Sequence, residues 1–282
     1  MNELCSPRAV QALLNRFGLK PNRGLGQNFL IDANILNKIV TAADLSPGDT
    51  VLEIGPGLGT LTRSLAEKAA AVLAIEKDRQ LEPLLTETLA GLPVRLIADD
   101  ALNVDYGELM QGVESPKVVA NLPYYVTTPL IINLLRARVS WENLVFLVQR
   151  EVVDRIIARP GTKEYGMLSI VVQYFAQPKL VTLVPPGAFF PPPNISSAVV
   201  QLSPWAESPY QLHVDENDLF QIAKAALAMR RKTLLNALAA ELSLPRAEVR
   251  ELIIALGWSP DRRGETLSVH ELVQLTNRIN GC

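Results

Sequence analysis

The sequence predicts an α/β protein with a doubly wound, mainly parallel sheet followed by a small all-helical domain. Between residues 50 and 158, short apolar runs alternate with amphipathic helical periods, which is the pattern of βαβ units. After Ser203–Pro204 the strand pattern stops and only helical periods follow. We therefore expect two domains in the 282-residue chain, residues 1–204 and residues 205–282.

The first forty residues form a basic segment before the sheet, with five basic and two acidic side chains. Residues 7–17 have the period of a short amphipathic helix, and residues 20–27 form a basic loop that contains glycines. Asp32 is placed to cap a helix through Ala42 whose apolar residues recur on one face.

The strands and helices that follow are predicted from their apolar patterns. Buried strands are expected at residues 50–54, 71–75, 94–98, 117–120 and 144–148. Helices are expected between and after them, at residues 60–69, 79–89, 128–137 and 151–158. Residues 180–183 and 197–202 flank a proline-rich turn and are expected to form an antiparallel pair at the sheet edge. The second domain should contain helices at residues 215–229, 233–240, 246–256 and 268–280.

The composition narrows the class of protein. Hydrophobic residues make up 48% of the chain and charged residues 20%, which excludes a largely disordered protein. The formal net charge of −2 excludes a uniformly basic nucleic-acid coat but is compatible with a local basic face. With two cysteines and two histidines, we expect neither a metal site nor a disulfide framework. The two cysteines, Cys5 and Cys282, stand at opposite ends with no CxxC motif, so we expect a reducing, cytoplasmic setting. No apolar run has the length of a membrane span, and the start lacks the apolar core of a signal peptide.

A glycine motif, VLEIGPGLGT at residues 51–60, runs from a strand through a turn into a helix. Gly55 and Gly57 allow the backbone to turn tightly and to approach a ligand closely. The GxGxG spacing differs from the dinucleotide fingerprint GxGxxG and no phosphate-binding GK[ST] is present, which disfavours an NAD-dependent oxidoreductase. Glu53 would repel a pyrophosphate; it either caps the loop or touches the ligand. The motif favours a nucleoside without phosphates.

Carboxylates follow the next two strands. Glu76 ends the second strand, where it can accept hydrogen bonds from two ribose hydroxyls. Of the pair Asp99 and Asp100 after the third strand, we favour Asp100 as the acceptor for an adenine amino group. Ligands of open α/β sheets bind at the carboxyl ends of the strands. Together these elements resemble the S-adenosylmethionine (SAM) site of a Rossmann-like methyltransferase.

The fourth strand ends in Asn121, Leu122, Pro123 and Tyr124, the candidate catalytic motif. NLPY resembles the [DNS]-P-P-[YFW] signature of methyltransferases that modify an exocyclic amino nitrogen. The lone pair of such an amine is delocalised into the ring, and it becomes a better nucleophile when the Asn121 oxygen and a nearby backbone carbonyl accept its hydrogens. Pro123 fixes the turn, and Tyr124 offers a face on which the target base can stack. Since the amine can lose its proton after methyl transfer, the reaction needs no strong general base. Catalysis then comes mainly from positioning the amine in line with the methyl group.

Phe189 and Phe190 precede the proline run and offer a second aromatic face. An extruded base is commonly held between two such faces. We assign Phe189 to the base and Phe190 to the core.

From residue 20 to residue 280 the sequence resembles the small-subunit rRNA adenine N6,N6-dimethyltransferases of the KsgA type. The motifs that carry the resemblance are GLGQNFL (24–30), VLEIGPGLGTLT (51–62), VVANLPYYVTTPLI (118–131), LVQREVVDRI (147–156), YGMLSIVVQYF (165–175), AFFPPPNISSAVV (188–200) and MRRKTLLNAL (229–238). The resemblance implies a Rossmann-like class I SAM-dependent methyltransferase sheet with a small C-terminal all-helical domain. It implies that two methyl groups are transferred to each of two adjacent adenosines near the 3′ end of small-subunit rRNA. It also implies that cofactor contacts come from Asn28, Leu30, Gly55, Gly57, Glu76, Asp100 and Asn121.

The RNA-contacting surface is predicted from basic clusters. Arg230, Arg231 and Lys232 form the densest cluster, at the start of a helix, and Arg150 begins a second group with helical spacing. The second domain holds nine basic and ten acidic residues and is not a broad basic platform. We therefore expect the protein to dock on an assembled ribosomal particle rather than on free RNA. Nothing in the sequence demands a dimer, and we expect a monomer.

Three other functions share parts of this pattern. The large-subunit rRNA methyltransferases of the macrolide-resistance group have the same catalytic core, but RRKTL at 230–234 and LSVHELVQLTN at 267–277 favour the small-subunit group. A DNA adenine methyltransferase would carry a sequence-reading domain, which this chain does not obviously have. A non-catalytic RNA-binding or assembly factor on the same fold would not need an intact NLPY motif.

Overall fold

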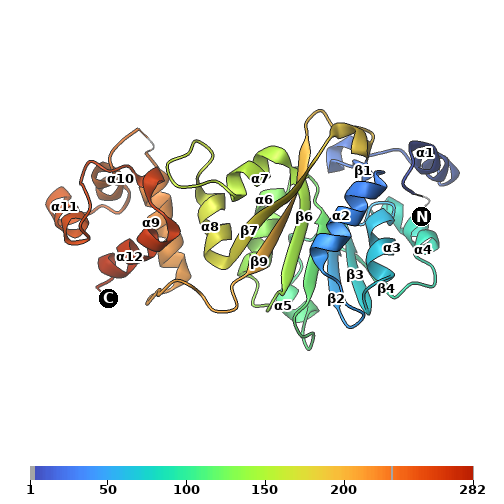
Figure 1. Cartoon of the computed structure of the whole chain (residues 1–282), viewed down its shortest axis with the longest axis horizontal. Helices are drawn as coiled ribbons and strands as arrows, with labels where there is room; N and C mark the ends of the chain where they lie inside the picture. Colours follow the sequence, from blue (N-terminus) through green and yellow to red (C-terminus); the bar gives the residue numbers. More distant parts are fainter. Residues whose placement is uncertain (1–3, 230, 282) are drawn as a thin grey trace. The chain divides into compact units, whose positions relative to one another are not determined.

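The computed structural model describes residues 4–229 and 231–281, and the chain folds into two compact units (Figure 1). The sheet unit comprises the described residues up to 153 together with residues 178–204. The helical unit comprises residues 154–177 and the described residues from 205 onward. The boundary expected near residue 204 therefore leaves out one segment of the helical unit, residues 154–177.

Side-chain contacts explain why this segment joins the helical unit. Helix α8 (Met167–Phe175) packs against α9 (Glu216–Leu227). The Tyr165 hydroxyl donates to the Leu267 carbonyl at 2.8 Å, and Tyr165 is buried. These contacts join residues about fifty and about one hundred positions apart, which the local sequence pattern does not reveal. Helix α8 itself was not among the helices expected from the sequence.

The described part of the sheet unit contains a seven-stranded sheet in the order β4-β3-β2-β5-β6-β9-β7. Strands β2 to β6 are parallel, and β9 runs antiparallel to β6. The bounds are β2 (Thr50–Ile54), β3 (Ala71–Glu76), β4 (Val94–Ala98), β5 (Lys117–Asn121), β6 (Asn143–Gln149), β7 (Ala176–Val184) and β9 (Ser197–Pro204). The predicted α/β class is confirmed. The order reverses between β2 and β5, which creates a crevice at the carboxyl ends of these strands.

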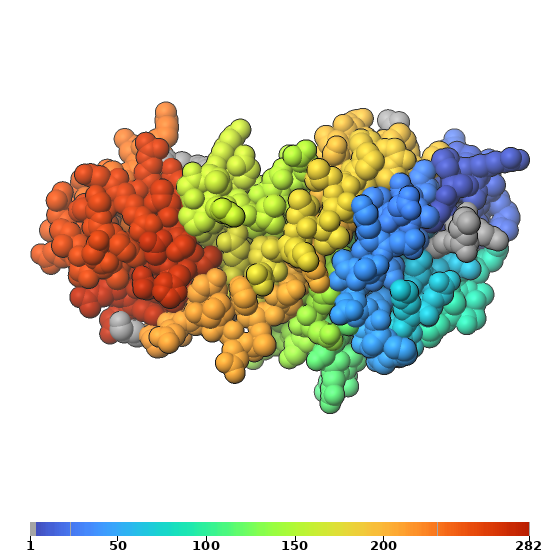
Figure 2. Space-filling model, viewed as in Figure 1, coloured from blue at the N-terminus to red at the C-terminus, as the bar shows by residue number. Residues whose placement is uncertain are grey.

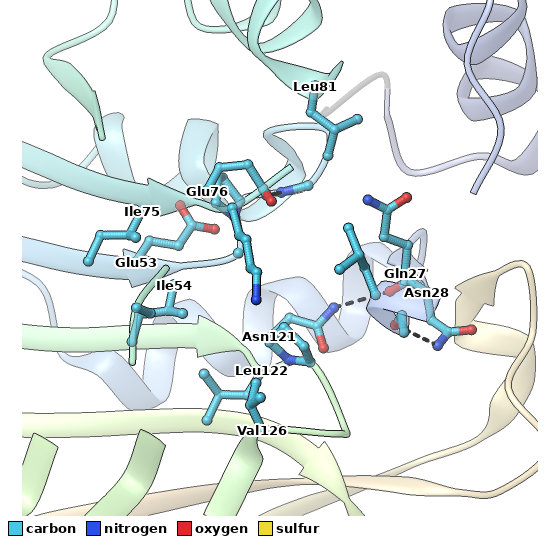
Figure 3. A pocket seen from close by; sticks show the side chains of 18 of the residues that line it. Gln27, Asn28, Glu53, Ile54, Ile75, Glu76, Leu81, Asn121, Leu122 and Val126 are labelled. Atoms are coloured by element: carbon cyan, nitrogen blue, oxygen red, sulfur yellow. Dashed lines mark hydrogen bonds between the residues drawn. The ribbon is translucent and has the colours of Figure 1, made fainter. Parts of the chain in front are cut away.

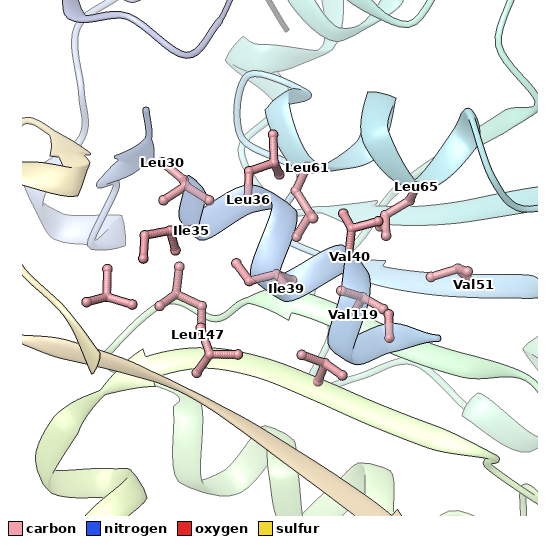
Figure 4. Packing of buried hydrophobic residues seen from close by; sticks show 14 of the residues in the cluster. Leu30, Ile35, Leu36, Ile39, Val40, Val51, Leu61, Leu65, Val119 and Leu147 are labelled. Atoms are coloured by element: carbon pink, nitrogen blue, oxygen red, sulfur yellow. The ribbon is translucent and has the colours of Figure 1, made fainter. Parts of the chain in front are cut away.

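One face of the sheet is covered by α2 (Ala33–Ala43) and α3 (Thr60–Ala66). Ile39 of α2 and Leu65 of α3 share a buried cluster with Val51, Val119 and Leu147 of the sheet (Figure 4). Asp32 caps α2 as the sequence predicts, because its Oδ1 accepts the Asn34 and Ile35 N–H groups at 2.8 and 3.1 Å. This packing holds the N-terminal segment next to the crevice.

Three side chains of the sheet satisfy the carbonyl groups at the end of α2. Lys117 donates to the Asp44 carbonyl at 2.5 Å, Asn143 donates to the Ala42 and Ala43 carbonyls, and Gln201 also reaches Ala42. Unpaired carbonyls at a helix end are costly when buried, so these contacts fix α2 on the sheet.

Helix α1 (Pro7–Arg16) packs against α4 (Glu82–Thr88) through a separate apolar cluster that includes Leu13, Leu14 and Leu85. Figure 2 shows the dark-blue N-terminal segment beside the cyan segment that contains α4. The predicted helix 79–89 begins as a 3-10 turn (Arg79–Leu81) because Asp78 caps Gln80 at 3.1 Å and the α-helix starts only at Glu82.

Two very short strands, β1 (Phe29–Leu30) and β8 (Phe189–Phe190), pair antiparallel and join the GQNFL segment to the proline-rich segment. The other helices of the sheet unit are α5 (Tyr106–Leu109), α6 (Thr127–Arg136) and α7 (Arg150–Ile156), the last of which continues into the helical unit. The other described helices of the helical unit are α10 (Leu234–Glu241), α11 (Arg246–Ala255) and α12 (Val269–Ile279).

Candidate active site

A cavity opens at the carboxyl ends of β2, β3, β4 and β5 (Figure 3). It lies at the point where the strand order reverses, which is where ligands of open α/β sheets bind. Its wall is built from residues 25–30, 53–58, 60–61, 75–77, 81, 99–101, 121–126 and 130. The GQNFL segment, the glycine motif, both carboxylate positions and NLPY therefore meet in one cavity.

The glycine loop requires glycine for both backbone and steric reasons. Gly55 and Gly57 have φ angles of 71° and 59°, a region that residues with a Cβ rarely adopt. A Cβ on Gly57 would lie 3.1 Å from a ring carbon of Phe29. The loop is thus pressed against the β1 segment and ends at Thr60, where α3 begins.

Glu76 is the last residue of β3 and its carboxylate is held by the backbone. Oε1 accepts the Asp78 N–H at 2.8 Å and Oε2 accepts the Gly57 N–H at 3.3 Å. Burial raises the pKa of Glu76, although these two N–H groups act against the rise. The carboxylate has further lone pairs for hydroxyl donors in the cavity.

Asp100 follows β4 and also faces the cavity. Its Oδ1 accepts the Leu102 N–H at 3.0 Å, and its Oδ2 lies 2.7 Å from Lys77 Nζ. The hydrogen bond from Lys77 lowers the pKa of Asp100 below its usual value. Asp99 also lines the cavity, but its Oδ1 accepts the Asp100 N–H at 2.7 Å and so supports the turn.

Glu53 lies beneath the glycine loop and is 1% exposed. Among the described residues, its Oε2 has no hydrogen-bond partner. Burial, reinforced by the nearby charge of Glu76, raises the pKa of Glu53 to about 8. This carboxyl is therefore mostly protonated at neutral pH.

Asn121 ends β5 and is tied to the GQNFL segment. Its Nδ2 donates to the Asn28 carbonyl at 3.2 Å, and Asn28 Nδ2 donates to the Gly26 carbonyl at 3.0 Å (Figure 3). Because its amide nitrogen is engaged, Asn121 has its Oδ1 to offer as an acceptor. An exocyclic amine in the cavity is a suitable donor for that oxygen.

The turn after Asn121 is locked by contacts that the sequence does not reveal. The Pro123 carbonyl accepts the Val126 N–H at 3.2 Å and the Thr127 hydroxyl at 3.0 Å. The Tyr124 hydroxyl lies 2.8 Å from Ser197 Oγ, 73 residues away in the chain. Leu122 is buried below the turn, whereas Tyr124 is half-buried at the cavity wall.

Gln27 is a further residue of the site that the sequence analysis passed over. Its Nε2 donates to Asp78 Oδ2 at 2.7 Å, and its Oε1 accepts the Asn22 N–H at 2.8 Å. The loop before β1 is therefore tied to the end of β3 as well as to Asn121. Its position inside the GQNFL motif is the sequence feature that could have identified Gln27 as part of the site.

The two adjacent phenylalanines are placed in the reverse of the expected order. Phe189 is 2% exposed and belongs to the same apolar cluster as Leu30, with which it pairs, whereas Phe190 is only half-buried. Neither residue is part of the cavity wall. Side chains alternate across a strand, and the pairing with β1 turns Phe189 into the core. Phe189 does not present a free face to a base in this structure.

The predicted RNA-contacting residues lie in both units. Arg150 is exposed at the start of α7 in the sheet unit, and Arg231 and Lys232 are exposed in the helical unit. Arg230 lies outside the described residues. Arg231 and Lys232 lie in the turn directly before α10, because Thr233 is the cap of that helix and accepts the Asn236 N–H.

Within residues 4–229 and 231–281, no group of three His, Cys, Asp or Glu side chains is arranged to hold a metal ion. Over the same part of the chain, no helix combines the length and apolar character that crossing a bilayer requires.

Comparison with known proteins agrees with this arrangement. Ribosomal RNA small subunit methyltransferase A of Moorella thermoacetica is 46% identical over an alignment of 288 positions, gaps included. The alignment covers 99% of each chain. A dimethyladenosine transferase from Plasmodium falciparum has a similar structure, with a TM-score of 0.79 and 25% identity over 90% of this chain and 98% of that one. The 23S rRNA methyltransferase ErmE shares the fold, with a TM-score of 0.68 and 24% identity over 90% of this chain and all of that one. Residues 18–280 match the model of the ribosomal RNA adenine dimethylases, and the chain belongs to that family.

Proposed function

We propose that this protein transfers methyl groups from SAM to the N6 atoms of two adjacent adenosines near the 3′ end of small-subunit 16S rRNA, two per adenosine, during ribosome biogenesis. The observation that carries the proposal is the presence of Asn121, an acceptor for an exocyclic amine, in the same cavity as Glu76 and Asp100, which suit an adenosyl ligand. Family membership and the relatives named small subunit methyltransferase A support the substrate.

The cavity suits SAM better than a phosphate-bearing cofactor. Four carboxyl groups line it, those of Glu53, Glu76, Asp99 and Asp100, and phosphates would be repelled by the ionised ones. Glu76 accepts the ribose hydroxyls and Asp100 accepts the adenine amino group. Gly55 and Gly57 let the backbone approach the ligand, while Asn28 and Leu30 close the cavity from the N-terminal side.

Bound SAM supplies an electrophilic methyl group on a sulfonium, and the protein prepares the amine that attacks it. Asn121 Oδ1 and a backbone carbonyl of the Leu122–Pro123 turn accept the amine hydrogens, which localises the nitrogen lone pair. Tyr124 fixes the plane of the base by stacking. The proton is lost from the product amine to water, so the site needs no strong general base and works mainly by orientation.

The RNA is held by basic side chains outside the cavity. We assign this role to Arg150, Arg231 and Lys232, together with Arg230. Long basic side chains contact phosphates without reading sequence, so selection of the two adenosines comes from docking on a ribosomal particle. In this proposal the protein acts as a monomer in the cytoplasm, where its particle is assembled.

The test uses purified protein, radiolabelled SAM, and small and large ribosomal subunits from a strain that lacks the dimethyladenosines. We expect dimethyladenosine, identified by nucleoside analysis, in the small-subunit rRNA only. Label confined to large-subunit rRNA would assign the protein to the macrolide-resistance activity instead. Binding of SAM without label on either subunit would indicate another nucleic acid or a non-catalytic role in assembly.

A further inference from the structure

Lys77 directly follows Glu76, and its ammonium group lies on the carboxylate of Asp100. Nζ is 2.7 Å from Asp100 Oδ2, and both side chains line the cavity. The Lys77 side chain is 50% exposed and that of Asp100 is 26% exposed. The ion pair therefore forms part of the cavity wall and remains accessible to water.

One oxygen of Asp100 holds the turn, and the other faces Lys77. Oδ1 accepts the Leu102 N–H at 3.0 Å, which fixes the plane of the carboxylate. Oδ2 is the oxygen that Lys77 contacts. An adenine amino group that approaches Oδ2 from the cavity therefore meets the Lys77 ammonium at the same oxygen.

We propose that Lys77 sets the affinity of this site by competing with the adenine amino group for Asp100 Oδ2. The inference rests on the proposed function, in which Asp100 binds adenine. Binding of an adenosyl ligand exchanges the ion pair for a hydrogen bond to a neutral amine and releases the lysine into solvent. Because the ion pair is partly exposed, the competition weakens binding by about two- to fivefold.

Weaker binding suits a reaction that exchanges its cofactor repeatedly. Each adenosine takes two methyl groups, so S-adenosylhomocysteine must leave and SAM must enter between the two transfers. Both molecules carry the same adenine, and Lys77 weakens both to the same extent. Re-formation of the ion pair after each transfer opposes retention of the spent cofactor.

The experiment measures the dissociation constants of SAM and S-adenosylhomocysteine by calorimetry for the full-length protein and four variants. K77M removes the ammonium and keeps most of the aliphatic stem. D100N keeps the shape of Asp100. The single side-chain oxygen of the asparagine accepts the Leu102 N–H, so its NH₂ group faces the adenine amino group and cannot accept a hydrogen bond from it. K77M/D100N completes the cycle. K68M is the matched control, because Lys68 is exposed near the end of α3 and lies outside the cavity wall.

We expect K77M to bind both ligands about two- to fivefold more tightly, K68M to match the wild type, and the effect of K77M to vanish in the D100N background. Tighter binding of SAM alone would overturn the inference. It would indicate long-range repulsion of a cationic ligand, since S-adenosylhomocysteine has no net charge. Unchanged or weaker binding by K77M, with D100N impaired, would overturn the role of Lys77 and leave Asp100 as proposed. Unchanged binding by D100N would instead remove Asp100 from the cofactor site and overturn both.

Discussion

The hydroxyl oxygens of Tyr124 and Ser197 lie 2.8 Å apart, and this contact ties the acceptor turn to the first residue of β9. Ser197 is fully buried, whereas Tyr124 is half-buried at the cavity wall. The far end of the tyrosine ring is thus held by the sheet, and its near end by the Pro123 turn. A ring restrained at both ends presents a fixed plane to an incoming base.

Removing this contact should slow methyl transfer without affecting the cofactor. We expect Y124F and S197A each to lower the single-turnover rate by about two- to tenfold, which corresponds to one neutral hydrogen bond. The dissociation constant of SAM should not change. The double variant should be no slower than the slower single variant, because both substitutions remove the same contact. If the rate reductions of the two single variants multiplied in the double variant, the two residues would act separately.

Replacing Asn121 should affect turnover far more than cofactor affinity. The Asn121 oxygen contacts the reacting amine, so N121A should lower the methylation rate on the order of a hundredfold, comparable to the loss of one preorganised hydrogen bond at a reacting atom. SAM titration should give a dissociation constant that changes far less than the rate does. N133A, at an exposed position of α6, is the control and should retain full activity. Near-normal turnover in N121A would contradict the proposed mechanism.

Glu76 should act on the cofactor rather than on the chemical step. E76A removes the acceptor for two ribose hydroxyls and also frees the Gly57 N–H, so we expect SAM to bind about ten- to a hundredfold more weakly. Calorimetry with E76A and with the exposed control E82A provides the comparison. An unchanged dissociation constant in E76A would remove this residue from the cofactor site.

The parallel strands and the glycine motif were predictable because their signals are local. Strands 50–54 and 94–98 are short apolar runs between turn residues, and the structure has them at the predicted bounds. The expectation that 94–98 is buried was wrong, because β4 is the edge strand of the sheet and none of its residues is fully buried. The carboxyl ends of neighbouring parallel strands must lie at one edge. The sequence therefore predicts that Glu76, Asp100 and Asn121 lie at the same edge, and in the structure all three line one cavity.

The remaining features depend on contacts between distant segments. The β1–β8 pair has only two residues in each strand, too few to show a period, yet it decides that Phe189 rather than Phe190 is buried. In the sequence, Ser197 has the pattern of an ordinary strand residue, and only the folded chain shows its contact with Tyr124. Residues 154–177 precede the last strands of the sheet in the chain but pack with the helical unit. Each of these three features depends on tertiary packing, which the hydrophobic periodicity of the sequence does not reveal.

The buried Glu53 should make stability depend on pH. Its pKa is raised from 4.5 to about 8, chiefly by burial, so the folded protein holds a proton that the unfolded chain has lost. The stability contributed by this proton is fully present below pH 4.5 and is lost as the pH rises through 8, with a slope of at most about 1.4 kcal/mol per pH unit.

The isosteric variant E53Q, which cannot ionise, isolates this effect. The free energy of unfolding of E53Q relative to the wild type should rise steadily between pH 5 and pH 8, measured by urea denaturation without cofactor. E67Q, at an exposed position at the end of α3, should differ from the wild type by a constant amount over the same range. A constant difference for E53Q as well would show that Glu53 is ionised in the folded protein, which would require a cationic partner for it near the glycine loop.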